Sequence, residues 1–262
     1  MRSGKPVAVF AVLLVVSFAT MNAMPSDTLL AALLQEAVLA LVALVAVGLA
    51  VPDALKRCTQ TVQQRSIVRF TAITLLLVGL VGGAITLLAW LFAGGGTMAC
   101  FASTALPSTA DLMENLLLLL GICLLTGLYE ESFMRVLGIE AFERALDTKR
   151  TILASAALFA LLHVGAPDVS AGQLVLLQTA LKFGQALLFG VILGALYVRT
   201  RRLWPCAFIH AGFDVLYLAP NVLLTGTMPE TYASGAVGDT VLLAVSVLML
   251  SGIVLKIRKE IA

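Results

Sequence analysis

Long apolar stretches alternate with short polar segments along the whole sequence. A helix needs about 20 apolar residues to cross the hydrocarbon core of a bilayer. Eight stretches approach or exceed that length, so the pattern predicts an all-α, polytopic integral membrane protein whose helices form one bundle. The predicted spans are 6–23, 28–52, 70–93, 113–131, 151–165, 171–198, 203–219 and 237–255.

Outside the spans, lysine and arginine occur only in alternate connections. They occur before the first span and after the second, fourth, sixth and eighth, whereas the connections 24–27, 94–112, 166–170 and 220–236 contain none. By the positive-inside rule both termini are predicted to be cytoplasmic, which requires an even number of spans. The first span, flanked by MRSGK and MNA, also resembles a signal peptide, and its removal would leave seven spans with the same topology.

The composition predicts a single membrane domain over residues 1–262. Hydrophobic residues make up 60% of the chain and charged residues 12%, and the mean hydropathy of +1.03 excludes an ordinary soluble domain. The basic residues serve topology, so we expect the lipid bilayer as a partner and no nucleic acid. Ala- and Val-rich spans with this charge pattern indicate a bacterial inner membrane, while the sequence carries no signature of oligomeric state.

Ionisable side chains inside the apolar spans are the candidates for chemistry. Both histidines of the chain, His163 and His210, lie in such spans, and intramembrane ionisable groups usually face a polar interior or a functional site. Glu131 and Arg135 are four residues apart and can pair along one helix face. Glu130 is turned about 100° away from that face, so it is predicted to be the free carboxylate.

Two other spans repeat the one-turn spacing. Phe159 and His163 are four residues apart, as are His210 and Asp214. Side chains at this spacing share a helix face, so three helices each present a polar face that can point into one space.

These residues resemble the signature of a known family. The segment EESFMR, then Phe159-x-x-x-His163, then His210-x-x-x-Asp214 match in order the EExxxR, FxxxH and HxxxN/D motifs of the CPBP intramembrane proteases, which include Rce1-type CAAX prenyl endopeptidases and bacterial Abi proteins. The resemblance covers roughly residues 110–220, the expected catalytic core. It is specific mainly because all three motifs occur in order and use both histidines of the chain.

The resemblance implies hydrolysis of peptide bonds by a glutamate-activated water. Glu130 would be the general base, and His163 would help to hold the water. His210, with Asp214 beside it, would stabilise the tetrahedral oxyanion. The implied partner is a peptide or protein substrate, such as a CAAX-type, leader or bacteriocin-like peptide. The site is expected inside the bundle and open to the cytoplasmic side.

The same resemblance implies supporting roles for Glu131, Arg135 and Phe159. Rce1-type enzymes carry Asn at the position of Asp214, and an ionised Asp cannot donate to an oxyanion. We therefore expect either a protonated Asp214 or, preferably, an Asp214 that orients His210 by accepting its hydrogen bond.

Other functions are compatible with the same residues. Glu130, His163, His210 and Asp214 could bind zinc, although no HExxH motif is present; the expected cofactor is none, with zinc as the alternative. Buried Glu, His and Asp could also form an ion path in a transporter. A non-catalytic scaffold or immunity protein could keep the same fold.

Several polar positions lie outside the motifs. Glu36 and Lys182 could form an intramembrane ion pair, or each could line a wet cavity alone. Gln35 and Gln185 are further polar positions that the motifs do not explain. Segment 133–146 has apolar residues at helical spacing between charges, which predicts a helix along the cytosolic interface.

Overall fold

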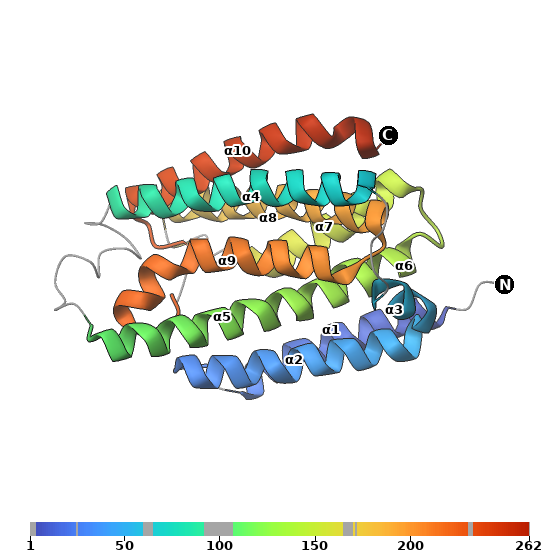
Figure 1. Cartoon of the computed structure of the whole chain (residues 1–262), viewed down its shortest axis with the longest axis horizontal. Coiled ribbons are helices and arrows are strands. Elements are labelled where there is room, and N and C mark those ends of the chain that lie inside the picture. Colours follow the sequence, from blue (N-terminus) through green and yellow to red (C-terminus); the bar gives the residue numbers. More distant parts are fainter. Residues whose placement is uncertain are drawn as a thin grey trace.

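The structure is a computed structural model that describes residues 4–24, 26–59, 65–91, 107–164, 170, 172–229 and 233–261. The described residues form a bundle of roughly parallel and antiparallel helices and contain no strand (Figure 1). The elements are α1 (Lys5–Ala23), α2 (Leu29–Ala50), α3 (Pro52–Thr59), α4 (Arg65–Leu91), α5 (Thr109–Glu131), the π-helical segment η2 (Ser132–Ile139), α6 (Glu140–Phe142), α7 (Thr148–Val164), α8 (Gln173–Thr200), α9 (Leu203–Thr225) and α10 (Val237–Ile261).

The predicted all-α membrane bundle is confirmed. Within the described residues, seven helices are long and apolar enough to cross a membrane. The remaining predicted span corresponds to α7, which has 17 residues and begins with Lys149 and Arg150 in its first turn. At about 1.5 Å per residue, α7 is only about 25 Å long and is shorter than the neighbouring α8.

The segment after α5 differs from the prediction of an interfacial helix. The whole of η2 is buried, and it continues α5 into the core instead of lying on a surface. Together with α6 it extends the apolar span to Phe142. Apolar residues at helical spacing occur both in surface helices and in buried helices whose polar groups are paired inside the protein. The prediction of an interfacial helix was wrong because the polar groups of this segment are paired in the interior.

Small residues allow the central helices to approach closely. α5 packs most extensively on α9, where a Cβ atom on Gly127 would lie 2.6 Å from the Ala207 carbonyl oxygen. On α8, a Cβ atom on Gly190 would lie 3.0 Å from the Cα atom of Ala156 on α7. Close backbone approach at small residues is the usual basis of helix association in membranes, and it brings α5, α7 and α9 around one interior space.

Helix α9 continues to Thr225, beyond the predicted end at residue 219, although Pro220 lies inside it. Proline has no N–H, so the carbonyl of Leu216 loses its helical partner. The Oγ1 atom of Thr86 on α4 lies 2.5 Å from that carbonyl oxygen and replaces the missing donor. The helix then ends at Gly226, whose φ of 68° is the left-handed conformation that glycine adopts easily.

The two termini, α3 and α6 lie at one end of the bundle, which we call the basic end because its connections contain the lysines and arginines (Figure 1). Glu140 accepts from Arg57 at 2.7 Å and lies 3.3 Å from Arg201, which also bonds Glu143 at 2.6 Å. Burial lowers the pKa of Arg201, but the bond and charge of Glu143 outweigh burial and raise that pKa overall. These ion pairs tie α3, α6 and the α8–α9 turn together.

Candidate active site

Glu131 and Arg135 form the predicted ion pair, and it is fully buried. Arg135 Nε lies 2.9 Å from Glu131 Oε2, and neither side chain has any solvent exposure. The guanidinium also donates to Ser155 Oγ on α7 at 3.1 Å and lies over the Phe159 ring, 4.8 Å from its centroid. Arg135 therefore ties the junction of α5 and η2 to α7.

Glu131 has a second partner that the sequence did not indicate. Its Oε1 atom lies 2.9 Å from His210 Nδ1, so one carboxylate holds both Arg135 and His210. Because a carboxylate paired with arginine is an acceptor, Nδ1 carries the proton and donates it. This bond fixes the His210 ring and turns its Nε2 atom toward Glu130 and Asp214.

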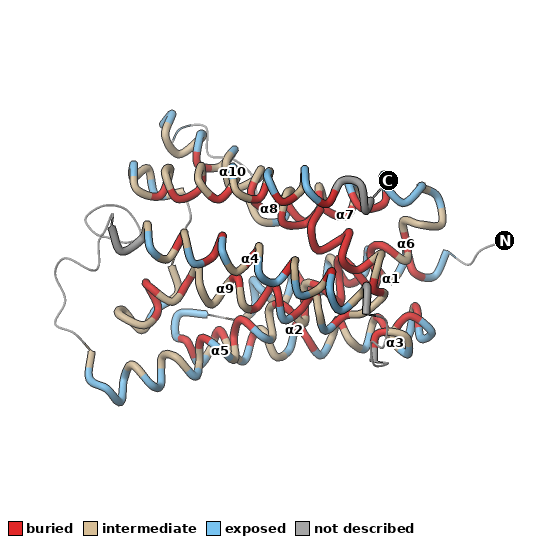
Figure 2. The backbone as a smooth tube through the Cα atoms, turned by 45° about the horizontal axis from the view of Figure 1, so that its top comes forward, coloured by how far each residue is buried: buried red, intermediate tan, exposed pale blue. Residues whose placement is uncertain are grey.

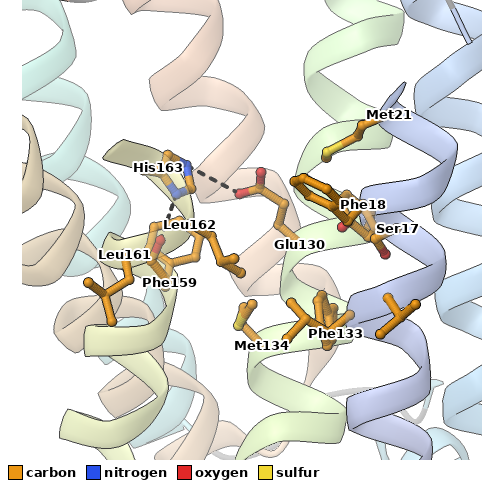
Figure 3. Close-up of a pocket in the computed structure, with 13 residues that line it drawn as sticks. Ser17, Phe18, Met21, Glu130, Phe133, Met134, Phe159, Leu161, Leu162 and His163 are labelled. Atoms are coloured by element: carbon orange, nitrogen blue, oxygen red, sulfur yellow. Dashed lines mark hydrogen bonds and ion pairs between the residues drawn. The ribbon is translucent and has the colours of Figure 1, made fainter. Parts of the chain in front are cut away.

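Glu130 lies close to both imidazoles, and Figure 3 shows its contact with His163. Its Oε2 atom is 3.7 Å from His163 Nε2 and 3.5 Å from His210 Nε2. That oxygen is buried and has no hydrogen-bond partner among the described atoms. The structure thus agrees with the prediction for the adjacent carboxylates: Glu131 pairs with Arg135, and Glu130 does not pair with an arginine.

His163 is held by its own helix. Its Nδ1 atom lies 2.8 Å from the Phe159 carbonyl oxygen, and the two rings lie against one another with centroids 4.2 Å apart. A carbonyl oxygen only accepts, so Nδ1 is the protonated nitrogen and the Nε2 atom of a neutral ring faces Glu130 as an acceptor. Phe159 therefore supports the site twice, since its ring also lies beneath Arg135.

Asp214 lies on the same face of α9 as His210, as the spacing predicts. Its Oδ2 atom is 3.3 Å from His210 Nε2, the nitrogen that also faces Glu130. Glu131 bonds His210 at Nδ1, a contact that the preferred prediction for Asp214 did not include. The structure places Asp214 as a second carboxylate beside His210 Nε2.

Two cavities meet at Glu130 and His163. One has a volume of about 650 Å³ and is almost entirely apolar, with walls from α1, α5, η2 and α7 (Figure 3). The other, which we call the polar cavity, has a volume of about 300 Å³ and a mixed lining with more polar groups than the first. Gln35, Glu36 and Lys182, which lie outside the motifs, line this cavity together with the motif residues His210 and Asp214.

Glu36 and Lys182 therefore line the same cavity as the motif residues, whereas the second prediction for them has each lining a wet cavity alone. Lys182 Nζ donates to Gln185 Oε1 at 3.0 Å, and its charge interacts with Asp214 and Glu130. Glu36 has a hydrogen bond with the Thr126 side chain. No motif spacing could have joined Glu36 and Lys182, because they lie on different helices, α2 and α8.

Metal binding was the alternative reading of the same side chains. In the described part of the chain, no three His, Cys, Asp or Glu residues are arranged as a metal-binding group. The three described cysteines, Cys58, Cys123 and Cys206, are free and buried.

This bundle buries a carboxylate close to two imidazoles. It therefore belongs to the class of polytopic membrane proteins that carry ionisable groups inside the bilayer. Residues 112–216 match the family model described as Rce1-like, type II CAAX prenyl endopeptidase Rce1-like. The matched segment carries all three motifs, and the match supports a CPBP/CAAX protease assignment for the chain. No curated protein matches the chain. The family points to an intramembrane CAAX-type endopeptidase in general.

Proposed function

We propose that this protein is an intramembrane endopeptidase in which Glu130 activates water for attack on a peptide bond. The observation that carries the proposal is the buried Glu130 Oε2 atom, which has no hydrogen-bond partner among the described atoms and faces two imidazoles where two cavities meet. General bases need this combination of access to substrate and freedom from a fixed partner.

The geometry supports a place for the water. Glu130 Oε2 and His163 Nε2 are 3.7 Å apart and both are acceptors, so they cannot bond to each other directly when both are unprotonated. A water molecule has two donors and can satisfy both. Its oxygen lone pairs then point away from these groups, toward a substrate carbonyl carbon.

The reaction then follows with protons accounted for. Glu130 takes one proton from water as the oxygen attacks the carbonyl carbon, and the carbonyl π pair becomes the oxyanion. His210 Nε2, protonated and stabilised by Asp214 at 3.3 Å, donates to that oxyanion. The C–N bond breaks when Glu130 returns its proton to the leaving amine. A carboxylic acid and an amine result.

The apolar cavity suggests what binds beside the scissile bond. It is lined by Phe18, Met21, Phe133 and Met134 among others, next to Glu130. We propose that it holds a large apolar side chain or a lipid-modified residue of the substrate, in keeping with the prenyl endopeptidase model that the chain matches. The polar cavity would hold the peptide on the other side of the bond.

The location follows from the same proposal. We expect the protein in a bacterial cell membrane with both termini in the cytoplasm, because the lysines and arginines cluster at one end of the bundle.

The proposal is tested by purifying the protein in detergent and following cleavage of a pool of apolar and prenylated peptides by mass spectrometry. Glu130→Gln should reduce the cleavage rate about 10²- to 10⁴-fold, which is the usual contribution of a general base. Glu114→Gln is the matched control, because Glu114 is an exposed carboxylate on the same helix. A folded Glu130→Gln variant with wild-type activity, or a folded wild type that cleaves no peptide in the pool, would contradict the proposal.

A further inference from the structure

Glu36 is a carboxylate of the polar cavity that no motif includes and that the proposed reaction does not use. It lies on α2 and lines the cavity together with Glu130 and Asp214. An ionisable side chain inside a membrane bundle is costly, and such residues usually mark a functional site. The position of Glu36 beside the candidate base therefore indicates a role in the same reaction.

The inward face of α2 carries Glu36. Along α2, buried residues alternate with residues that are more exposed (Figure 2). Glu36 is one turn from Ala32 and one turn from Ala40, which are both buried, so its side chain shares their face. The neighbouring Gln35 donates to two carbonyl oxygens at the end of α1, at 3.3 and 2.9 Å. These bonds fix the first turns of α2 against α1.

The two carboxylate oxygens of Glu36 differ in their partners. The carboxylate has a hydrogen bond with the side chain of Thr126, which lies one turn before Glu130 on α5 and lines the same cavity. The Oε2 atom is buried and has no hydrogen-bond partner among the described atoms. In the described part of the chain, Glu130 Oε2 is the other buried carboxylate oxygen of this kind. A buried acceptor without a donor is costly, and a ligand that brings a donor removes that cost.

The charges around the polar cavity favour a cationic donor. The described lining contains the carboxylates of Glu36, Glu130 and Asp214, and its one lysine is Lys182. The charge of Glu36 acts on both Glu130 and Asp214, so the three carboxylates share one electrostatic environment. In the proposed reaction Lys182 and a protonated His210 balance two of the three negative charges. One negative charge remains for a substrate to neutralise.

We infer that Glu36 determines specificity by binding a basic side chain of the substrate in the polar cavity. The Oε2 atom of Glu36 accepts from a lysine ammonium or an arginine guanidinium, while the large apolar residue of the same peptide lies in the apolar cavity on the other side of Glu130. This inference rests on the proposed peptidase function and adds a substrate class to it. The preferred substrates are peptides with a basic residue close to an apolar or lipid-modified residue.

Cleavage of matched peptides tests the inference. Each peptide carries a prenylated cysteine, and one following position is lysine, norleucine or glutamate, where norleucine replaces lysine by an uncharged aliphatic side chain. At one of these positions, wild type should have a higher kcat/KM for the lysine peptide than for the norleucine peptide. Glu36→Gln should reduce this ratio about 10- to 100-fold, as expected for a hydrogen bond between charged groups. Glu114→Gln, which removes an exposed carboxylate, should leave the ratio unchanged.

Charge reversal separates recognition from a structural role. Glu36→Lys should shift the preference at the same position from the lysine peptide to the glutamate peptide, a change that a structural role of Glu36 does not produce. Melting temperatures in detergent identify the folded variants. An unchanged ratio in folded Glu36→Gln, or no preference for lysine in wild type, would overturn the inference and leave the peptidase intact.

A binding measurement separates the inference from the proposed function. In the Glu130→Gln background, the lysine peptide should bind more tightly than the norleucine peptide, and adding Glu36→Gln should remove the difference. Equal affinities in the Glu130→Gln background would overturn the inference. If folded wild type cleaves none of the peptides while binding still depends on Glu36, the peptidase is contradicted and Glu36 remains the residue that binds the basic side chain.

Discussion

Replacement of Arg135 by leucine should destabilise the protein strongly. The arginine is fully buried, and its removal leaves the buried Glu131 carboxylate without the permanent cation that it pairs with. It also removes the bond to Ser155 and the contact with the Phe159 ring, which link the α5–η2 junction to α7.

The magnitude follows from the burial of both partners. Removing one member of a buried ion pair usually costs about 3–5 kcal/mol, because an uncompensated charge stays in the interior. For a chain of this size, that loss corresponds to a fall of roughly 10 °C in melting temperature. An exposed pair contributes about 0–1 kcal/mol.

Arg150 provides the matched control, since its pair with Asp147 is exposed on both sides. Thermal unfolding in detergent, followed by intrinsic fluorescence, should show the large fall for Arg135→Leu and a change within about 2 °C for Arg150→Leu. The double variant Glu131→Gln with Arg135→Leu should recover part of the loss because the stranded charge is gone. Equal melting temperatures for the two single variants, or a double variant less stable than Arg135→Leu, would refute the reasoning.

Three further outcomes are expected. Gly127→Ala should lower the melting temperature by several degrees, because the new Cβ would lie 2.6 Å from the Ala207 carbonyl oxygen and overpacking costs about 1–3 kcal/mol. Gly79→Ala should leave the melting temperature unchanged, because its Cβ would meet open space. Equal effects of the two substitutions would contradict the packing described for α5 and α9. Burial raises the pKa of the Cys58 thiol, so a variant with Cys58 as its only cysteine should react with maleimide more slowly when folded than when unfolded at pH 7, and faster as the pH rises; equal rates would show an accessible thiol. Peptide cleavage should survive a strong chelator, and loss of cleavage with recovery on added zinc would replace the glutamate–water mechanism by a metal-dependent one.

Much of this architecture could be predicted from the sequence because it depends on local spacing. The length of apolar runs sets the spans, and a four-residue spacing within one helix was enough to pair Glu131 with Arg135 and leave Glu130 free. Such inferences need only the geometry of a single helix.

The failures concern contacts between helices. The bond from His210 to Glu131 joins positions 79 residues apart. The sequence pairs Glu131 with Arg135, but a carboxylate has two oxygens and can bind a second partner as well. The buried position of η2 and the set of residues that line each cavity likewise depend on how helices pack around one another. Periodicity describes the faces of a helix but not which neighbour covers each face.

The bond from Thr86 to the Leu216 carbonyl has a consequence for membrane insertion during synthesis. A backbone carbonyl without a hydrogen-bond donor costs several kcal/mol in lipid. Because of Pro220, α9 alone in the bilayer would have such a carbonyl and would be unstable there. α4 is synthesised before α9 and can already be in the membrane when α9 emerges from the ribosome. Chain order thus supplies the hydroxyl before the carbonyl that needs it, and a circular permutant that makes α9 first should insert that helix less efficiently.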